Sequence, residues 1–409
     1  MTAAARAVRT PPSRRPLLAV LAAVLCIDAL TALVVLGYGN AYLLRTLGAP
    51  ASAPALALTV YGVVKLLTAP LAGRVVDVAR AHTVLGGTAA VELAALAVIL
   101  ATRSAPGYFV GIGALAAGIA TSWIIAFRAL GAVTAAGERG AVASSMSIVS
   151  AVATGAGFGI AVVIADTGPW WLPFALGVCL ALASVALLRP PATPAPPDPT
   201  PLLGEPSTPA PQPLADPEPA AGTPPAAARL AAAGVVFGHF CIVTGLLVVF
   251  WPFTLELLGL SPLRSLVLLL PAGATGGAAL VLSGRRSRPG QRLPPAAALS
   301  ALGAAGLGAT AVATNAPWFA AAAVLVAPAL AGAQPVLIAS MIDISRITRR
   351  AGTALGWIFS AEALGAIAGP AIVGTAIELW DVRAGVVTIA VGAALLAALA
   401  ATASRFARL

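Results

Sequence analysis

Residues 17–40 read LLAVLAAVLCIDALTALVVLGYGN, an apolar run that holds one charged residue, Asp28. A helix needs roughly 20 mainly apolar residues to cross a hydrocarbon core of about 30 Å. This run has that length, and it is too long for the apolar core of a signal peptide. It also has no convincing small-x-small cleavage site. We therefore expect residues 17–40 to form an uncleaved first membrane-spanning helix.

Eleven further segments meet the same rule, and a different stretch divides them into two groups. Residues 189–229 hold 15 of the 34 prolines and no apolar face, which is typical of a disordered or polyproline-like linker. The sequence thus predicts an all-α integral membrane protein with two six-helix bundles, residues 1–188 and 230–409, joined by a Pro-rich cytoplasmic linker at 189–229. The expected spans after the first are 54–75, 83–102, 108–133, 142–165, 170–188, 230–253, 263–283, 295–314, 318–342, 352–376 and 384–403.

The composition excludes a soluble protein. Of the 409 residues, 59% are hydrophobic and 9% are charged, whereas soluble domains have about 45–50% apolar and about 25% charged residues. The mean hydropathy is +0.97. Three single cysteines and two histidines offer neither a disulfide framework nor a metal site. We expect no metal and no cofactor.

The arginines indicate the orientation in the membrane. If the N-terminus lies inside, 18 of the 24 basic residues fall in cytoplasmic segments and four in outside loops. Cytoplasmic loops carry such an excess, so we expect both termini inside a multi-pass protein of the inner (cytoplasmic) membrane. Basic loops beside an anionic leaflet also explain the net charge of +10, so the charge does not require a role in nucleic-acid binding. The bias toward arginine and alanine is typical of a GC-rich bacterial genome.

The two groups of spans repeat each other weakly. One constant shift along the chain pairs Gly140 with Gly352 and Gly157 with Gly369. In each case the span starts after an arginine-containing turn and ends at an acid. Duplicated six-helix halves of this kind are common among secondary transporters.

The turn after the second span carries a recognisable pattern. Residues 73–80 read GRVVDVAR, in which Gly73 permits a close helix approach and Asp77 suits the N-terminus of a neighbouring helix. The pattern resembles the G-x-L-a-D-r-x-G-r signature of the major facilitator superfamily, with Val78 at a usually basic position and Arg80 at the second glycine. The resemblance covers nearly the whole chain, and it implies that this turn is a cytoplasmic gate latch.

A second pattern lies in the eleventh span. Gly365, Gly369, Pro370 and Gly374 resemble the G-x-x-x-G-P motif associated with antiporters in this family, although that motif normally lies in the fifth span. Small residues at this spacing let two helices pack closely, and proline bends a helix. The pattern therefore predicts either plain helix packing or a part in the gating motion.

Charges near the middle of a span are costly, about 2.5–3.5 kcal/mol each on insertion scales. Asp28 and Lys65 are each the twelfth residue of their spans, so the two side chains share a depth and can pair. Asp28 is a candidate to bind a proton, a cationic substrate or each in turn; the alternative is a static Asp28–Lys65 pair that only joins two helices. By the resemblance, Glu92 lies on a peripheral span, and we expect it to neutralise Lys65 or Arg128.

Three more ionisable residues are candidates for the site. By the resemblance, spans 1, 4, 7 and 10 line a central cavity, so that Asp28, Arg128 and His239 face it. His239 is a candidate proton relay or a neutral side chain bonded to a helix carbonyl, and Glu362 is a candidate coupling or substrate residue. Arg128 is a substrate or gate residue, unless it only reaches toward the cytoplasmic surface. Four aromatic side chains are candidates to stack on a flat or cationic ligand: Tyr38, Tyr61, Trp123 and Trp357.

These features favour a secondary transporter that works by alternating access, most simply one that exports amphiphilic or cationic compounds in exchange for protons. Its partners are a small-molecule substrate, protons and the lipid bilayer, and the fold can act as a monomer. The alternatives are an uptake permease for a nutrient or metabolite and a non-transporting receptor. A membrane enzyme is disfavoured because the chain has no phosphate-binding G-x-x-x-x-G-K-[ST] loop.

Overall fold

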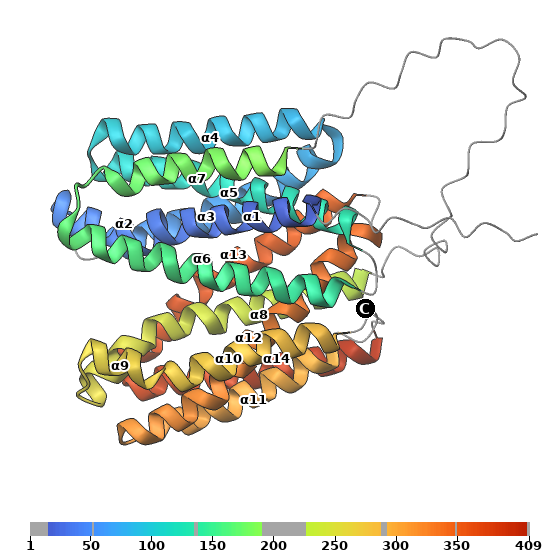
Figure 1. Cartoon of the computed structure of the whole chain (residues 1–409). Helices are drawn as coiled ribbons and strands as arrows, with labels where there is room; N and C mark the ends of the chain where they lie inside the picture. Colours follow the sequence, from blue (N-terminus) through green and yellow to red (C-terminus); the bar gives the residue numbers. More distant parts are fainter. Residues whose placement is uncertain are drawn as a thin grey trace, which may run out of the picture.

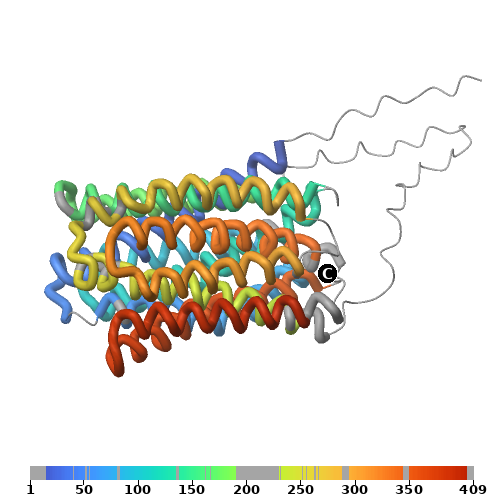
Figure 2. The backbone as a smooth tube through the Cα atoms, turned by 90° about the horizontal axis from the view of Figure 1, so that it is seen from below, coloured from blue at the N-terminus to red at the C-terminus, as the bar shows by residue number. Residues whose placement is uncertain are grey.

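The computed structural model describes residues 15–50, 53–134, 138–189, 226–287, 293–347 and 350–406, and these residues form helices with no strand among them. Figure 1 shows two layers, α1 to α7 in blue to green and α8 to α14 in yellow to red. The N-terminal Arg6, Arg9 and Arg14, and most of the expected linker (190–225), lie outside the described residues. Figure 2 shows that α1 begins and α14 ends at the same end of the molecule.

Each of the twelve expected spans coincides with helix. Nine helices of the described residues are long and apolar enough to cross a membrane, and α7 is a shorter apolar one. The first set of helices is α1 (Arg15–Leu30), η1 (Thr31–Gly37), α2 (Tyr38–Ala41), η2 (Tyr42–Thr46), α3 (Ala53–Val78), α4 (Ala81–Thr102), α5 (Ala105–Val133), α6 (Arg139–Thr167) and α7 (Leu172–Leu188). The second set is α8 (Ala226–Trp251), η4 (Pro252–Leu257), α9 (Pro262–Leu268), α10 (Leu270–Arg286), α11 (Leu293–Ala311), α12 (Ala316–Ile347), α13 (Ala351–Leu379) and α14 (Val382–Phe406).

Local sequence places the helix boundaries. Ser104 caps α5, since its Oγ accepts a hydrogen bond of 3.2 Å from the backbone N–H of Gly107. The expected span 263–283 is divided between α9 and α10 at Leu269. Pro271 follows in the first turn of α10, where the missing N–H of proline costs no hydrogen bond.

The repeat seen in the sequence recurs in the packing. A Cβ atom added to Gly157 of α6 would meet the carbonyl oxygen of Ala29 on α1, and one added to Gly369 of α13 would meet that of Cys241 on α8. The constant shift that pairs Gly157 with Gly369 also pairs Ala29 with Cys241. Glycine is therefore required at matching positions of the two sets because one helix backbone lies directly against another.

Beyond this point the first copy is one residue longer than the second. Gly48 and Gly259 both have φ of +62°, but the constant shift pairs Gly48 with Leu260. The first set thus has one more residue between Ala29 and Gly48 than the second has between Cys241 and Gly259. The π-helix η1 lies in this interval. A π-helical turn holds more residues than an α-helical one. Since η2 (Tyr42–Thr46) has a counterpart in η4 (Pro252–Leu257), the unmatched η1 accommodates the additional residue.

The contacts between the two sets extend from about one turn beyond the middle, where a Cβ atom added to Gly62 of α3 would meet Ile367 of α13, to one end of the molecule. We call this the arginine-rich end, because Arg74, Arg139, Arg285 and Arg350 lie there at the ends of α3, α6, α10 and α13. α3 packs against α13, α6 against α10 and α12, and α5 against α12. At the arginine-rich end the backbones touch at two pairs of glycines, Gly73 with Gly352 and Gly140 with Gly284.

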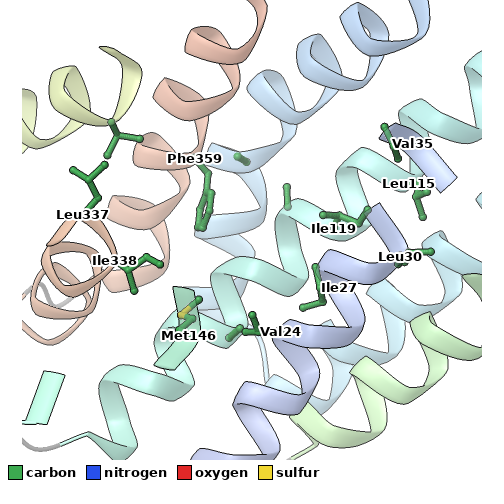
Figure 3. Packing of buried hydrophobic residues seen from close by; sticks show 14 of the residues in the cluster. Val24, Ile27, Leu30, Val35, Leu115, Ile119, Met146, Leu337, Ile338 and Phe359 are labelled. Atoms are coloured by element: carbon green, nitrogen blue, oxygen red, sulfur yellow. The ribbon is translucent and has the colours of Figure 1, made fainter. Parts of the chain in front are cut away.

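The buried core continues across this boundary. In Figure 3, Val24 of α1 lies beside Met146 of α6, and Met146 lies toward Ile338 of α12 in the second set. All three side chains are at most 7% exposed. The two sets are thus packed together from the arginine-rich end to the middle of the molecule.

We expect Gly369→Ala to destabilise the protein and Gly374→Ala not to. The methyl group at 369 would strike the Cys241 carbonyl, and overpacking costs about 1–3 kcal/mol. Gly374 lies on the same helix with open space around it, where alanine gains about 1 kcal/mol of helix propensity. The melting temperatures of the purified variants in detergent measure the difference; equal melting temperatures would contradict the packing.

Candidate functional site

A buried ion pair joins the two sets near the middle of the molecule. The Nζ atom of Lys65 on α3 lies 2.7 Å from Oε1 of Glu362 on α13, and the two side chains are 9% and 15% exposed. A charge in such surroundings is stable only when it is paired. The pair is therefore a link between the two sets as well as a polar site.

Asp28 on α1 lies beside this pair. The Ser150 hydroxyl on α6 donates a hydrogen bond to the Asp28 carboxyl, and Lys65 and Glu362 both interact with it electrostatically. The Oδ2 atom of Asp28 is buried and accepts no hydrogen bond from the described residues. Among the residues that the structure describes, one carboxylate oxygen at the site is thus left without a donor.

Tyr61 completes the group. It lies one turn before Lys65 on α3, its hydroxyl is hydrogen-bonded with that of Thr31, and it interacts electrostatically with Lys65 and both acids. We call Asp28, Tyr61, Lys65, Ser150 and Glu362 the central polar cluster. It draws on α1, α3, α6 and α13, and it holds two acids and one base.

Aromatic rings separate the central polar cluster from the arginine-rich end. The Lys65 ammonium lies 5.6 Å from the centroid of the Phe359 ring, close enough for a cation–π interaction. Phe359 contacts Phe127 and Trp123 of α5, with centroids 5.6 Å and 6.3 Å away. Since Phe359 lies nearly one turn closer to the arginine-rich end than Glu362, these rings close that side of the cluster.

The expected partners of Lys65 and Glu92 were wrong. Lys65 pairs with Glu362 instead of Asp28, because α3 packs against α13 and α5 whereas α1 packs against α5, α6 and α7. Glu92 neutralises neither Lys65 nor Arg128. It is 1% exposed and accepts a hydrogen bond of 3.0 Å from the Ser122 hydroxyl inside the first set.

At the arginine-rich end, Asp77 binds the first turn of α13. Its carboxylate accepts hydrogen bonds from the backbone N–H groups of Gly352 and Thr353, at 2.7 and 2.8 Å, and from the Thr353 hydroxyl at 2.8 Å. A negative charge is favourable at a helix N-terminus. Arg128 donates a hydrogen bond to the Val76 carbonyl and lies 4.0 Å from Asp77, so it supports this junction and is not part of the central polar cluster.

A second junction lies between α6 and the helices α10 and α12. Arg139 and Asp343 form a buried ion pair of 2.5 Å, and the Ser144 hydroxyl donates to the Leu280 carbonyl at 2.8 Å. The sequence did not predict this pair, because Arg139 was counted among the arginines of the cytoplasmic loops. The one feature of the sequence that indicates it is Asp343, an acid at the end of the tenth span.

The other candidate residues lie elsewhere. His239 is buried on α8, edge-on to Phe240, and none of the interactions that define the central polar cluster involves it. Tyr38 packs with Tyr42 and Phe174 in the core of the first set, and Trp357 is 59% exposed.

The glycines of the eleventh span face α8. Cβ atoms added to Gly365 and Gly369 would meet the backbones of Phe237 and Cys241, and Pro370 lies inside the same helix. This motif therefore packs two helices within the second set. Within the described residues, no three His, Cys, Asp or Glu side chains are grouped to hold a metal ion.

Comparisons with known proteins extend this description. A family model described as Major Facilitator Superfamily matches residues 19–370. The crystal structure of the human organic anion transporter MFSD10 (TETRAN) is similar with a TM-score of 0.72 and 18% identity, covering 96% of this chain and 100% of that chain. At this identity the likeness concerns the fold alone. A search of curated proteins found no match.

We expect Asp77→Asn to loosen the arginine-rich end. The amide keeps the shape but loses the charge and one acceptor, and loss of a helix cap costs about 0.5–2 kcal/mol, or roughly two- to thirtyfold in an equilibrium. Amide hydrogen exchange across residues 351–356 should accelerate by that factor. Asp381→Asn is the control, because Asp381 caps α14 within the second set through a 2.7 Å bond from the Ala384 N–H. Equal acceleration in both variants would argue against a junction at Asp77.

We also expect Lys65→Met to lower the melting temperature more than the double change Lys65→Met with Glu362→Gln. Removal of one member of a buried pair costs about 3–5 kcal/mol, whereas removal of both charges is often nearly neutral. Thermal unfolding in detergent compares the two proteins. A double variant no more stable than the single one would show that the two side chains are not coupled.

Proposed function

The chain belongs to the major facilitator superfamily, and on that premise we propose that it exports amphiphilic or cationic compounds in exchange for protons. Transport by such a multi-pass membrane protein requires a site that is open to each side in turn. The helices at residues 1–188 and 230–409 are the two rocking units of this proposal, joined by the linker at 189–229.

The observation that carries the proposal is the surplus of negative charge in the central polar cluster. Lys65 compensates Glu362 at 2.7 Å, which leaves Asp28 with a buried oxygen that has no donor among the described residues. A buried carboxylate without a partner attracts a proton or a cation. Asp28 is therefore the residue that we assign to the proton, and the negative charge that it adds to the central polar cluster favours a cationic substrate there.

The contacts between the two sets assign the structure to one state of the proposed cycle. The named contacts between the sets run from the arginine-rich end to about one turn beyond the Lys65–Glu362 pair, and we take the arginine-rich end as cytoplasmic by the positive-inside rule. We therefore assign this structure to the state that is closed to the cytoplasm. In that state a proton reaches Asp28 from outside and weakens the binding of a cation; its release on the inner side restores binding.

The charge of the central polar cluster also bears on the alternatives. MFSD10 is described as an organic anion transporter, and an anionic substrate would need a base without a partner. In the central polar cluster the acids outnumber the bases, so we propose cations. Uptake of a nutrient or metabolite remains the second candidate for the direction of transport.

We expect cells that express this chain to accumulate less of a cationic dye. Bacteria deficient in efflux would be loaded with a cationic or an anionic amphiphilic dye, with and without a protonophore. The reduction should be confined to the cationic dye, and either the protonophore or Asp28→Asn should abolish it. Glu92→Gln is the matched control, because Glu92 is likewise a buried carboxylate with one serine donor and one oxygen without a donor among the described residues, but it lies inside the first set and does not interact with Lys65 or Glu362.

Two results would contradict the proposal. Reduced accumulation of the anionic dye alone would reverse the substrate charge. Export of the cationic dye that survives Asp28→Asn would remove Asp28 from the mechanism.

A further inference from the structure

The Lys65–Glu362 pair lies on the surface along which the two sets must part. From the arginine-rich end, α3 and α13 touch at Gly73 and Gly352, then at Ala69 and Gly356. Farther in, the Ser360 hydroxyl donates to the Leu66 carbonyl at 2.9 Å, and the ion pair follows. An opening of the arginine-rich end that reaches the middle of the molecule separates Lys65 from Glu362.

Lys65 cannot remain without a partner after this separation. An isolated ammonium inside a membrane costs several kcal/mol. Asp28 belongs to the same set of helices as Lys65, so the two residues stay together when the sets part. The lysine side chain is long and flexible, and the Asp28 Oδ2 atom has no donor among the described residues.

We propose that Lys65 exchanges Glu362 for Asp28 when the arginine-rich end opens, and that this exchange drives the proton off Asp28. The inference rests on the proposed function and assigns Lys65 as the positioning residue that couples Asp28 to the two states. With the arginine-rich end closed, Lys65 binds Glu362 and Asp28 holds one proton from outside. With that end open, Lys65 binds the ionised Asp28 and the proton leaves to the inside.

The exchange also gives Glu362 a role. Once Lys65 has left, Glu362 is a bare carboxylate on the second set, and a cationic substrate from the inside can take the place of the ammonium group. When the sets close again, Lys65 returns to Glu362 and displaces the substrate. One proton enters for each monovalent cation that leaves, and the charge of the central polar cluster is balanced in both states.

The surroundings leave few competitors for the ammonium group. The ionisable groups that interact with Lys65 are Glu362 from α13, Asp28 from α1 and Tyr61 from α3 itself. α5 presents the rings of Phe127 and Trp123, and α6 presents Ser150 to Asp28. Asp28 is therefore the one acid of the first set within electrostatic reach of Lys65 among the described residues.

Spin labels at residues 18 and 230 test the exchange. Leu18 and Leu230 lie at the arginine-rich ends of α1 and α8, are 62% and 73% exposed, and occupy matching positions of the two copies. The labels are placed in a full-length chain in which Cys26, Cys179 and Cys241 are replaced by serine. Double electron–electron resonance gives the distribution of distances between the two labels, and from it the ratio of open to closed molecules. Glu92→Gln is again the control and should leave the ratio unchanged.

The exchange predicts opposite effects of two isosteric changes. Glu362→Gln releases Lys65 to Asp28, so the open-to-closed ratio should rise by about fivefold or more. Asp28→Asn removes the second partner of Lys65, so the ratio should fall by about fivefold or more. Fivefold is about the lower end of the usual coupling between two sites. In the parent protein the ratio should rise with pH, because ionised Asp28 recruits Lys65. Lys65→Met should abolish that dependence.

A Lys65–Glu362 pair that only clamps the two sets would give a different pattern. Glu362→Gln would then open the protein while Asp28→Asn left the ratio unchanged, and this result would overturn the exchange even if Asp28 is needed for export. Opposite shifts of the ratio in a protein that exports no cationic dye would support the exchange and reject the proposed substrate class.

Discussion

The packing of α3 against α13 is the contact on which the rest of the structure depends. It is the only place where the described residues show a charge of one set neutralised by the other near the middle of the molecule, and it continues through touching glycine backbones to the Asp77 junction. A buried ion pair is stable only while both partners are in place. The same pair that holds the closed state together therefore makes opening costly, unless another acid replaces the one that leaves.

The two junctions at the arginine-rich end use different chemistry at related positions. Gly73 approaches Gly352, and Gly284 approaches Gly140, so both copies bring helix backbones together. The Gly73–Gly352 junction then adds a carboxylate on a helix N-terminus, whereas the Gly140–Gly284 junction adds the buried Arg139–Asp343 pair. A capping carboxylate depends on the helix dipole, and an ion pair depends on two side chains, so the two junctions need not open at the same cost.

The spans and the Asp77 junction could be predicted from the sequence, since the first depends on the length of apolar runs and the second on a short motif. The partner of Lys65 could not. Equal depth in two neighbouring spans fixes a height in the membrane but not the direction in which a side chain points, and helices adjacent in the chain are not adjacent in the packing. The same limit applies to Gly365 and Gly369: their spacing predicted a close helix contact, and only the structure identifies α8 as the partner.

The π-helix η1 has a consequence for the ancestry of the chain and for its redesign. It begins at Thr31, shortly after Asp28, and it holds the residue by which the first copy exceeds the second. One residue turns an α-helix by about 100°, so an unbroken first helix would present Asp28 and Tyr42 to different neighbours. A symmetric transporter assembled from two identical halves would have this wide turn twice or not at all. The duplicated copies have thus diverged in length beside the buried acid that has no counterpart, since Phe240 occupies the matching position in the second copy.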